Sequence, residues 1–307
     1  MKRRQFLSHT GILATGMGIS AHTVAQNFDC YVQRLPGAQL YTIREALAVD
    51  PEAVLQALAA TGIREVELYG LTGEDSIFGM PLLSFRTLLD RYNLSMTCTH
   101  VFPENIEVAE VSRSARILGI DTVILTIAPG FIQSGAEGMR IQGPQTKEEM
   151  DRVADLLNSL GRRFRSEGML FGYHNHHVEF FPVADELPYN YIMWNTDPQF
   201  VRSELDIGWA ALSGVDYLDV LERFGPRILS CHMKDFNGIT PADMGDFLGA
   251  AAHLVPPGSG VVNFAAVLAH MDYFNIRHGF VEVDSSENPV EDLSKGIDHL
   301  QLIRPCN

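Results

Sequence analysis

The stretch RSELDIGWAALSGVDYLDVLERFGPRILSCHMKD (residues 202–235) contains a strand, a helix and a second strand in close succession. A β-rich run at Arg202–Ile207 precedes a helical apolar pattern at Tyr217–Arg223, and a second β-rich run follows at Ile228–Asp235. Two short strands with a helix between them are typical of the βαβ unit, in which the strands lie parallel in one sheet. This stretch therefore predicts a parallel sheet covered by helices.

The same alternation extends over nearly the whole chain of 307 residues. Six further β-rich runs lie at Ala38–Thr42, Glu65–Tyr69, Ser95–Val101, Thr122–Ala128, Met169–His176 and Gly279–Asp284. Helical patterns lie at Ile43–Ala60, Leu82–Tyr92, Ile106–Leu118, Thr146–Ser166, Phe264–Met271 and Pro289–Ile303, with a poorly defined one at Pro182–Asn195. Eight such units predict a single-domain (β/α)8 TIM barrel over residues 26–307. An open doubly wound sheet is the alternative, but no GxGxxG motif follows any strand.

The first 25 residues, MKRRQFLSHTGILATGMGISAHTVA, have the layout of an export signal. Basic residues at Lys2, Arg3 and Arg4 precede a mildly apolar segment that ends on the small residue Ala25. The arginine pair followed by Gln-Phe-Leu is similar to twin-arginine signals. We therefore expect residues 1–25 to be a signal peptide and the mature protein to be periplasmic. A basic helical start to a cytosolic protein is the alternative.

The charge of the chain excludes several classes of partner. The formal net charge is −15, and removing the signal, which holds three basic residues and no acid, takes it to −18. Nucleic acids and anionic membrane surfaces are poor partners for so acidic a protein. No apolar run reaches the ~20 residues of a membrane-spanning helix, so the mature protein should be soluble.

The four cysteines show no metal-binding spacing. Cys30, Cys98, Cys231 and Cys306 form no CxxC pair, which argues against a zinc knuckle. Free buried thiols are the first expectation. A disulfide between Cys30 and Cys306, near the two ends of the mature chain, is the alternative in an oxidising compartment.

Acid, base and metal-ligand side chains end most of the predicted strands, where a barrel of this kind carries its chemistry. They are Tyr41, Glu67, Tyr69, His100, His174, His176, Asp206, His232, Lys234, Glu282 and Asp284. Side chains alternate along a strand, so residues two apart share a face, as Glu204 and Asp206 do. Imidazole and carboxylate ligands without thiolates fit Mn²⁺, Co²⁺, Zn²⁺ or Mg²⁺. We therefore predict one divalent metal ion at the barrel mouth.

Seven phrases in order along the chain carry a family resemblance. They are GAQLYTIREAL (37–47), GIREVELYG (62–70), GYHNHHVEF (172–180), ELDIGWAALSG (204–214), CHMKD (231–235), GSGVVNF (258–264) and VEVD (281–284). With them the chain resembles the xylose-isomerase-like TIM barrels, the sugar phosphate isomerase/epimerase superfamily, and above all its exported branch, in which YHNHxxEF recurs. The resemblance covers nearly the whole mature chain. It implies a metal-dependent reaction on a small carbohydrate.

The resemblance also implies a set of metal ligands. Members of the superfamily hold the ion with an acid after strand five, an aspartate after strand six, a histidine after strand seven and a glutamate after strand eight. The last three correspond to Asp206, His232 and Glu282. After strand five this chain has His174 in the place of the glutamate, and the nearest acid is Glu179. Either Glu179 turns back to complete the site, which we favour, or His174 takes the position.

Proton abstraction next to a carbonyl is the chemistry that such a site supports. Return of the proton isomerises or epimerises the sugar, whereas loss of a β-substituent makes the enzyme a lyase. We assign catalytic roles to His174, Glu282 and Lys234, because imidazole is a suitable base near neutral pH and an ammonium can face the enolate oxygen. Substrate contacts are predicted for Tyr41, Glu67, His100, His176 and Trp209.

Two classes of function remain open. The main expectation is an isomerase or epimerase. β-Elimination on a 3-keto-glycoside or keto-inositol is the close alternative, because the two-glutamate relay of the epimerases is lost if His174 replaces one of the two glutamates. The last two strand loops hold no arginine pair to bind a phosphate, and Gly258–Gly260 offers backbone donors only, so we expect a non-phosphorylated sugar. The other class is a non-catalytic sugar-binding barrel. A homo-oligomer is possible.

Overall fold

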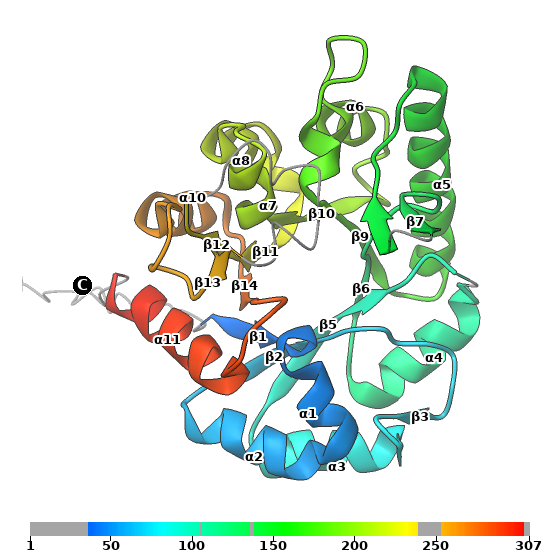
Figure 1. Cartoon of the computed structure of the whole chain (residues 1–307). Coiled ribbons are helices and arrows are strands. Elements are labelled where there is room, and N and C mark those ends of the chain that lie inside the picture. The colour runs from blue at the N-terminus through cyan, green and yellow to red at the C-terminus, as the bar shows by residue number, and fades with distance from the viewer. Residues whose placement is uncertain (1–35, 105, 136–137, 239–252, 304–307) are drawn as a thin grey trace, which may run out of the picture. The chain divides into compact units, whose positions relative to one another are not determined.

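The structure is a computed structural model that describes residues 36–104, 106–135, 138–238 and 253–303. Eight parallel strands close into a barrel in the order β1-β14-β11-β10-β9-β6-β5-β2, and helices lie around the outside of the strands (Figure 1). The predicted (β/α)8 barrel is confirmed. The predicted signal peptide and two of the cysteines, Cys30 and Cys306, lie outside the described residues.

The barrel strands are short, and most end earlier than the β-rich runs predicted. They are β1 Gly37–Gln39, β2 Glu65–Leu68, β5 Ser95–Val101, β6 Thr122–Leu125, β9 Leu170–His174, β10 Arg202–Asp206, β11 Ile228–Met233 and β14 His278–Val281. Several polar residues predicted to end strands therefore stand on the following loops, among them Tyr41, Lys234 and Glu282. Loops at this end of a barrel carry its chemistry.

The helices follow the predicted order with one correction. They are α1 Arg44–Val49, α2 Pro51–Ala60, α3 Leu82–Arg91, α4 Val108–Leu118, α5 Lys147–Ser166, α6 Pro188–Trp194, α7 Ile207–Leu212, α8 Tyr217–Phe224, α10 Phe264–Phe274 and α11 Pro289–Leu302. The single helix predicted over Ile43–Ala60 is wrong, because Asp50 leaves the helical conformation before Pro51 and caps α2 through Ala53 N, 3.0 Å away.

Some short elements of the loops after the strands were not predicted. They are the antiparallel strand pairs β3 Ser76–Ile77 with β4 Met80–Pro81, β7 Ile132–Gly135 with β8 Gly138–Ile141, and β12 Asp235–Phe236 with β13 Leu254–Val255, and the 3₁₀ turns η1 Leu40–Ile43 and η2 His177–Phe180. Helix α7, which follows β10 directly, is a further one. Elements of two to six residues are too short to show a reliable period in the sequence.

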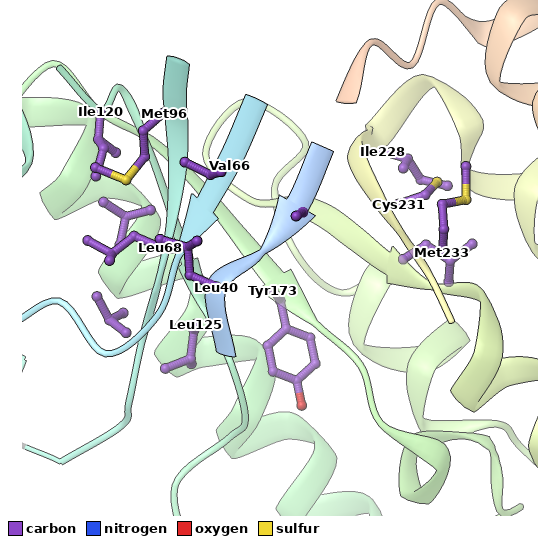
Figure 2. Packing of buried hydrophobic residues seen from close by; sticks show 14 of the residues in the cluster. Leu40, Val66, Leu68, Met96, Ile120, Leu125, Tyr173, Ile228, Cys231 and Met233 are labelled. Carbon is purple, nitrogen blue, oxygen red and sulfur yellow. The ribbon is translucent and has the colours of Figure 1, made fainter. Parts of the chain in front are cut away.

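The barrel strands have an apolar outer face, which packs against the helices, and an inner face, which points into the barrel. On β2, Val66 and Leu68 join the core between barrel and helices (Figure 2). Glu65 and Glu67 alternate with them and contact His278 on β14 and His232 on β11, strands that are not neighbours of β2. The interior of such barrels is usually filled by branched aliphatic side chains. Here this part of the interior is polar and hydrogen-bonded.

The structure bears on two predictions, one about the cysteines and one about membrane-spanning helices. The two described cysteines, Cys98 and Cys231, are buried and free, as predicted. Burial raises the pKa of both thiols, which keeps them protonated and unreactive at neutral pH. Among the described residues, no helix combines the length and the apolar character that crossing a membrane requires.

Candidate active site

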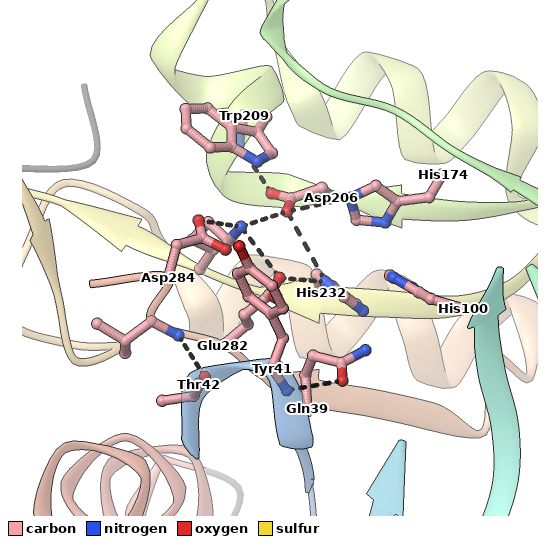
Figure 3. Close-up of polar contacts among 12 residues, drawn as sticks. Gln39, Tyr41, Thr42, His100, His174, Asp206, Trp209, His232, Glu282 and Asp284 are labelled. Atoms are coloured by element: carbon pink, nitrogen blue, oxygen red, sulfur yellow. Dashed lines mark hydrogen bonds and ion pairs between the residues drawn. The ribbon is translucent and has the colours of Figure 1, made fainter. Parts of the chain in front are cut away.

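Three of the four predicted metal ligands meet at the mouth of the barrel. Asp206 ends β10, His232 lies near the end of β11, and Glu282 directly follows β14 (Figure 3). His232 Nδ1 lies 2.7 Å from Glu282 Oε2 and 3.9 Å from Asp206 Oδ2. One ligand atom of each residue falls within 4.8 Å of the others, and all three residues are buried. His174 at the end of β9 joins them, with Nε2 3.7 Å from Asp206 Oδ2.

Helix α7 fixes the orientation of Asp206. Asp206 Oδ1 accepts a hydrogen bond from Trp209 N at 2.8 Å and so caps the helix, while the Asn175 side chain holds the backbone N–H and C=O of Asp206. Gly208 permits this arrangement, because a Cβ there would lie 2.7 Å from Lys234 Cβ and from the Lys234 carbonyl oxygen. Asp206 Oδ2 is left facing the cluster.

The donor set fits a divalent cation. Asp206 Oδ2 is buried and accepts no hydrogen bond from the described residues, although the Lys234 ammonium lies 3.3 Å away. Buried charged oxygens are normally hydrogen-bonded or bound to a metal. Two imidazoles, from His174 and His232, and two carboxylates, from Asp206 and Glu282, make a ligand set that suits Zn²⁺, Mn²⁺ or Co²⁺.

Lys234 is enclosed by three carboxylates at the same end of the barrel. Lys234 Nζ lies 2.7 Å from Asp284 Oδ2, 3.0 Å from Glu282 Oε2 and 3.3 Å from Asp206 Oδ2. Burial alone would lower the pKa of Lys234, but the charges of Asp206, Asp284 and Glu282 outweigh it and hold this pKa well above its ordinary value. The side chain is therefore an ammonium at neutral pH.

Glu282 and Asp284, the two carboxyl groups in the loop after β14, respond differently to Lys234. Burial would raise the pKa of Glu282, but the ammonium of Lys234 and the imidazole of His232 hold it well below its ordinary value. Burial dominates at Asp284 and raises its pKa to about 7, although Lys234 opposes the shift. Thr42 Oγ1 fixes the segment between them by accepting from Val283 N at 3.0 Å. Glu282 is thus an ionised carboxylate next to an ammonium.

A second polar layer lies below this cluster, and it contains a residue that we did not predict. Glu204 Oε2 lies 2.5 Å from His100 Nε2, 3.1 Å from His174 Nδ1 and 3.2 Å from His232 Nε2. Glu67 Oε2 lies 2.7 Å from His232 Nε2. Glu204 shares the inner face of β10 with Asp206, and this alternation was the signal that could have identified it. His100 and Glu67, predicted to contact substrate, belong to this buried layer.

Glu179, which we favoured as the strand-five ligand, does not reach the cluster. Tyr173 OH donates to Glu179 Oε1 at 2.5 Å, and His176 N donates to Oε2 at 3.0 Å. Tyr173 and His174 are successive residues of β9 and point to opposite faces of the strand, so a side chain that binds Tyr173 is turned away from His174. Of the two alternatives, the arrangement favours His174.

The remaining predicted substrate contacts lie around the cluster with different exposures. Trp209 is fully buried, with the His176 ring stacked on it at 6.0 Å and the Lys234 ammonium 4.8 Å from its centroid, so it offers no exposed face to a sugar ring. His176 is itself buried. Tyr41 is half-buried beside Tyr69, with ring centroids 5.4 Å apart, and is the most accessible of the set.

Part of the sequence is similar to proteins named inosose dehydratase. The protein of that name from Geobacillus thermodenitrificans is 33% identical over 151 residues, which are 47% of this chain and 49% of that protein. The one from Salmonella agona is 27% identical over 224 residues, 66% of each chain. The chain thus spans from about half to about two thirds of the length of these curated relatives.

Solved structures share the fold over most of the chain. A sugar phosphate isomerase/epimerase from Parabacteroides distasonis has a TM-score of 0.69 at 22% identity and covers 87% of this chain and 93% of its own. A xylose isomerase-like TIM barrel protein from Mycobacterium smegmatis in complex with magnesium has a TM-score of 0.63 at 14% identity, with coverages of 88% and 96%. The sequence matches one family description over residues 55–303, and the protein therefore belongs to the xylose isomerase-like TIM barrel family.

Proposed function

We propose that the protein is a divalent-metal-dependent lyase that eliminates a β-substituent from a non-phosphorylated cyclic keto-sugar, either a keto-inositol or a 3-keto-glycoside. The observation that carries the proposal is the ion pair between Glu282 and Lys234 at 3.0 Å, beside the cluster of Asp206, His232 and Glu282. This pair brings a carboxylate that can act as a base next to an ammonium that can act as an acid. The similarity to proteins named inosose dehydratase favours elimination over the isomerase or epimerase that we first expected.

The cation would be held by His174, Asp206, His232 and Glu282, which come from four neighbouring strands of the barrel. A divalent ion in such a site polarises the carbonyl and hydroxyl oxygens of a substrate and lowers the pKa of the carbon-bound proton next to the carbonyl. Burial lowers the pKa of His174 to about 4, so its imidazole is neutral at pH 7 and has a lone pair for binding.

Glu282 and Lys234 are placed for the two proton transfers of an elimination. The Glu282 carboxylate is ionised and can accept the proton from the carbon next to the carbonyl. The Lys234 ammonium can give a proton to the oxygen that leaves from the neighbouring carbon. Since the two groups are 3.0 Å apart, they reach the same face of a substrate ring, and the proton and the leaving group should depart from that same face.

The residue at the end of β9, the fifth strand of the barrel, argues against the two-base relay of an epimerase. That relay needs a carboxylate on each side of the substrate carbon. Here β9 ends on His174, and the next acid, Glu179, is hydrogen-bonded to Tyr173 on the other side of the strand. With Glu282 as the proposed base and no carboxylate at the end of β9, loss of a β-substituent is the reaction that the arrangement supports best.

The glycine-rich loop at residues 258–262 supports a substrate without phosphate. The N–H groups of Gly258, Gly260 and Val262 donate to the Asp235 carboxylate at 3.0, 2.9 and 3.1 Å. Those of Ser259 and Val261 donate to backbone carbonyls. All five amides therefore already donate to acceptors outside the loop, and none is free to bind a phosphate as loops of this composition often do.

One assay separates the possible functions. Metal-loaded protein is incubated in D₂O with a keto-inositol, a 3-keto-glycoside and their phosphorylated analogues, and the products are followed by NMR. We expect loss of water or of the aglycone from the unphosphorylated compounds. Deuterium exchange with rearrangement but no elimination would indicate an isomerase or epimerase. Binding without exchange, undiminished in a chelator, would indicate a sugar-binding barrel and would contradict the proposal.

A further inference from the structure

We propose that Glu204 and Glu67 are positioning residues that decide which ring nitrogen His174 and His232 present to the cation site. The inference depends on the proposed function only in that a divalent cation binds at the barrel mouth. It concerns the layer directly below that site, where both carboxylates are fully buried.

His174 is held through its Nδ1 atom. This atom lies 3.1 Å from Glu204 Oε2, whereas Nε2 faces Asp206 Oδ2 at 3.7 Å. A carboxylate only accepts hydrogen bonds, so a neutral imidazole in this place carries its proton on Nδ1. The lone pair of Nε2 is then directed to the cation site.

His232 is held through its other ring nitrogen, Nε2. Its Nε2 atom lies 2.7 Å from Glu67 Oε2, an oxygen that also accepts from Gln39 Nε2 at 2.8 Å. Its Nδ1 atom faces Glu282 and Asp206. Both nitrogens thus face a carboxylate oxygen at 2.7 Å, and both can donate while no cation is bound. A cation at the site would take the place of the Nδ1 proton, while the Nε2 proton would stay hydrogen-bonded to Glu67. The two imidazoles therefore present different nitrogens, and each choice follows from a different carboxylate below it.

Glu204 has little freedom to turn away from this role. Its Oε1 atom accepts from Ser230 Oγ at 2.6 Å, and its Oε2 atom also contacts His100 Nε2 at 2.5 Å. The His100 ring lies nearly parallel to that of His232, with an interplanar angle of 8° and centroids 5.1 Å apart. Carboxylates that bind the outer nitrogen of a ligating histidine fix its tautomer and its ring orientation. The barrel interior thus carries two carboxylate–histidine pairs that point at one site.

The test uses the Zn²⁺-loaded full chain with ¹⁵N-labelled histidine and long-range NMR to read which ring nitrogen of each histidine keeps its proton. We expect His174 as the Nδ1–H form and His232 as the Nε2–H form. Glu204→Leu should release His174 and leave His232 largely fixed, and Glu67→Leu should do the reverse. Glu204→Gln, which keeps an acceptor oxygen, should restore the His174 tautomer.

Cobalt binding gives the second measurement. Each leucine variant should weaken Co²⁺ binding by roughly 10–100-fold and change the visible spectrum of the bound ion. Glu65→Gln is the matched control, because Glu65, two residues before Glu67 on β2, makes a similar but partly exposed pair with His278 at 2.8 Å. It should leave both tautomers and the Co²⁺ spectrum unchanged.

Several results would overturn the inference. The opposite tautomer at either histidine in the unmodified protein is one of them, and this measurement stands even if the leucine variants do not fold. Equal effects of both leucine variants on both rings would indicate a general loss of structure. X-ray absorption of the Co²⁺-loaded protein that showed three imidazole ligands would place the ion within the group His100, His174, Glu204 and His232, with Glu204 as a ligand.

Discussion

Two buried carboxylates that we predicted as metal ligands, Glu282 and Glu179, have opposite surroundings. Glu282 lies 3.0 Å from the Lys234 ammonium and 2.7 Å from His232, and these neighbours hold its pKa well below the ordinary value. Glu179 accepts hydrogen bonds from Tyr173 and from a backbone amide, and burial raises its pKa to about 7. Two buried carboxyl groups thus differ in charge: Glu282 is ionised, whereas Glu179 is about half protonated at pH 7.

The contrast shows that position along a strand decides more than residue type or closeness in sequence. Glu179 is only five residues from His174, yet it packs on the opposite face of β9. Glu282 is more than a hundred residues from His174 in the sequence. Both nevertheless lie beside Asp206 and His232, because the ends of the parallel strands meet there (Figure 3). The predictions below test this difference.

The largest effect is expected at Glu282. Glu282→Gln keeps the size of the side chain but removes the charge that faces Lys234 and the cation site. We expect turnover to fall by roughly 10⁴-fold, since it loses the proposed base, and metal binding to weaken as well. Steady-state kinetics and elemental analysis of the purified variant measure both effects. Activity equal to that of the unmodified protein would remove Glu282 from the site.

Lys234 should affect the reaction without holding the metal. Lys234→Met removes the ammonium from among Asp206, Glu282 and Asp284 but retains the length of the chain. Turnover should fall by roughly 10²–10⁴-fold, because a general acid is lost. Metal content should not fall, since the variant lacks the ammonium that competes with the metal ion for these three carboxylates. A variant that purified without metal and regained activity in excess metal would instead indicate a structural role.

A smaller effect separates His174 from Glu179. His174→Ala should weaken metal binding by roughly 10–100-fold, whereas Glu179→Ala should leave metal stoichiometry unchanged. The second variant should instead lose roughly 1–3 kcal/mol of unfolding free energy, because the Tyr173 hydroxyl and the His176 amide lose their acceptor. Metal titration and urea unfolding of both variants give the comparison. Loss of metal from the Glu179 variant alone would restore our first interpretation.

The fold was predictable because its signal is local. The run Ser95–Val101 was predicted with the observed bounds of β5, and the alternation of strands and helices identified the barrel. Strand ends such as that of β14 were less accurate, because the apolar pattern continues into Val283 after the ladder has ended. Helix α7 was missed, since it is six residues long and begins within the predicted strand.

The candidate site was predictable only in its outer layer. Asp206, His232 and Glu282 came from the resemblance, which assigns ligands by strand order. Glu204 was visible as a partner of Asp206 on one face of β10, but the sequence does not show that the interior stays polar one layer further down. Trp209 was expected to face a sugar, yet the rings of His176, His177 and Phe236 pack against it and it is fully buried.

The last expected effect is a pH dependence of stability at Glu179, which leaves activity and metal content aside. Its pKa rises from 4.5 to about 7 on folding, so between these values the folded protein binds more protons than the unfolded chain. The contribution of Glu179 to stability is therefore complete below pH 4.5 and is lost as the pH rises to 7, a change of about 3 kcal/mol.

Glu179→Gln removes this titration and leaves the other buried groups in place. The free energy of unfolding of the unmodified protein, measured relative to the variant in urea and chelator, should fall as the pH is raised from 4.5 to 7.5. Glu148→Gln, at an exposed position in the first turn of α5, controls for the loss of one charge and should show no such trend. A difference that grew with rising pH would mean that Glu179 is stabilised as the ion. It would then resemble Glu282, and the contrast between the two carboxylates would not hold.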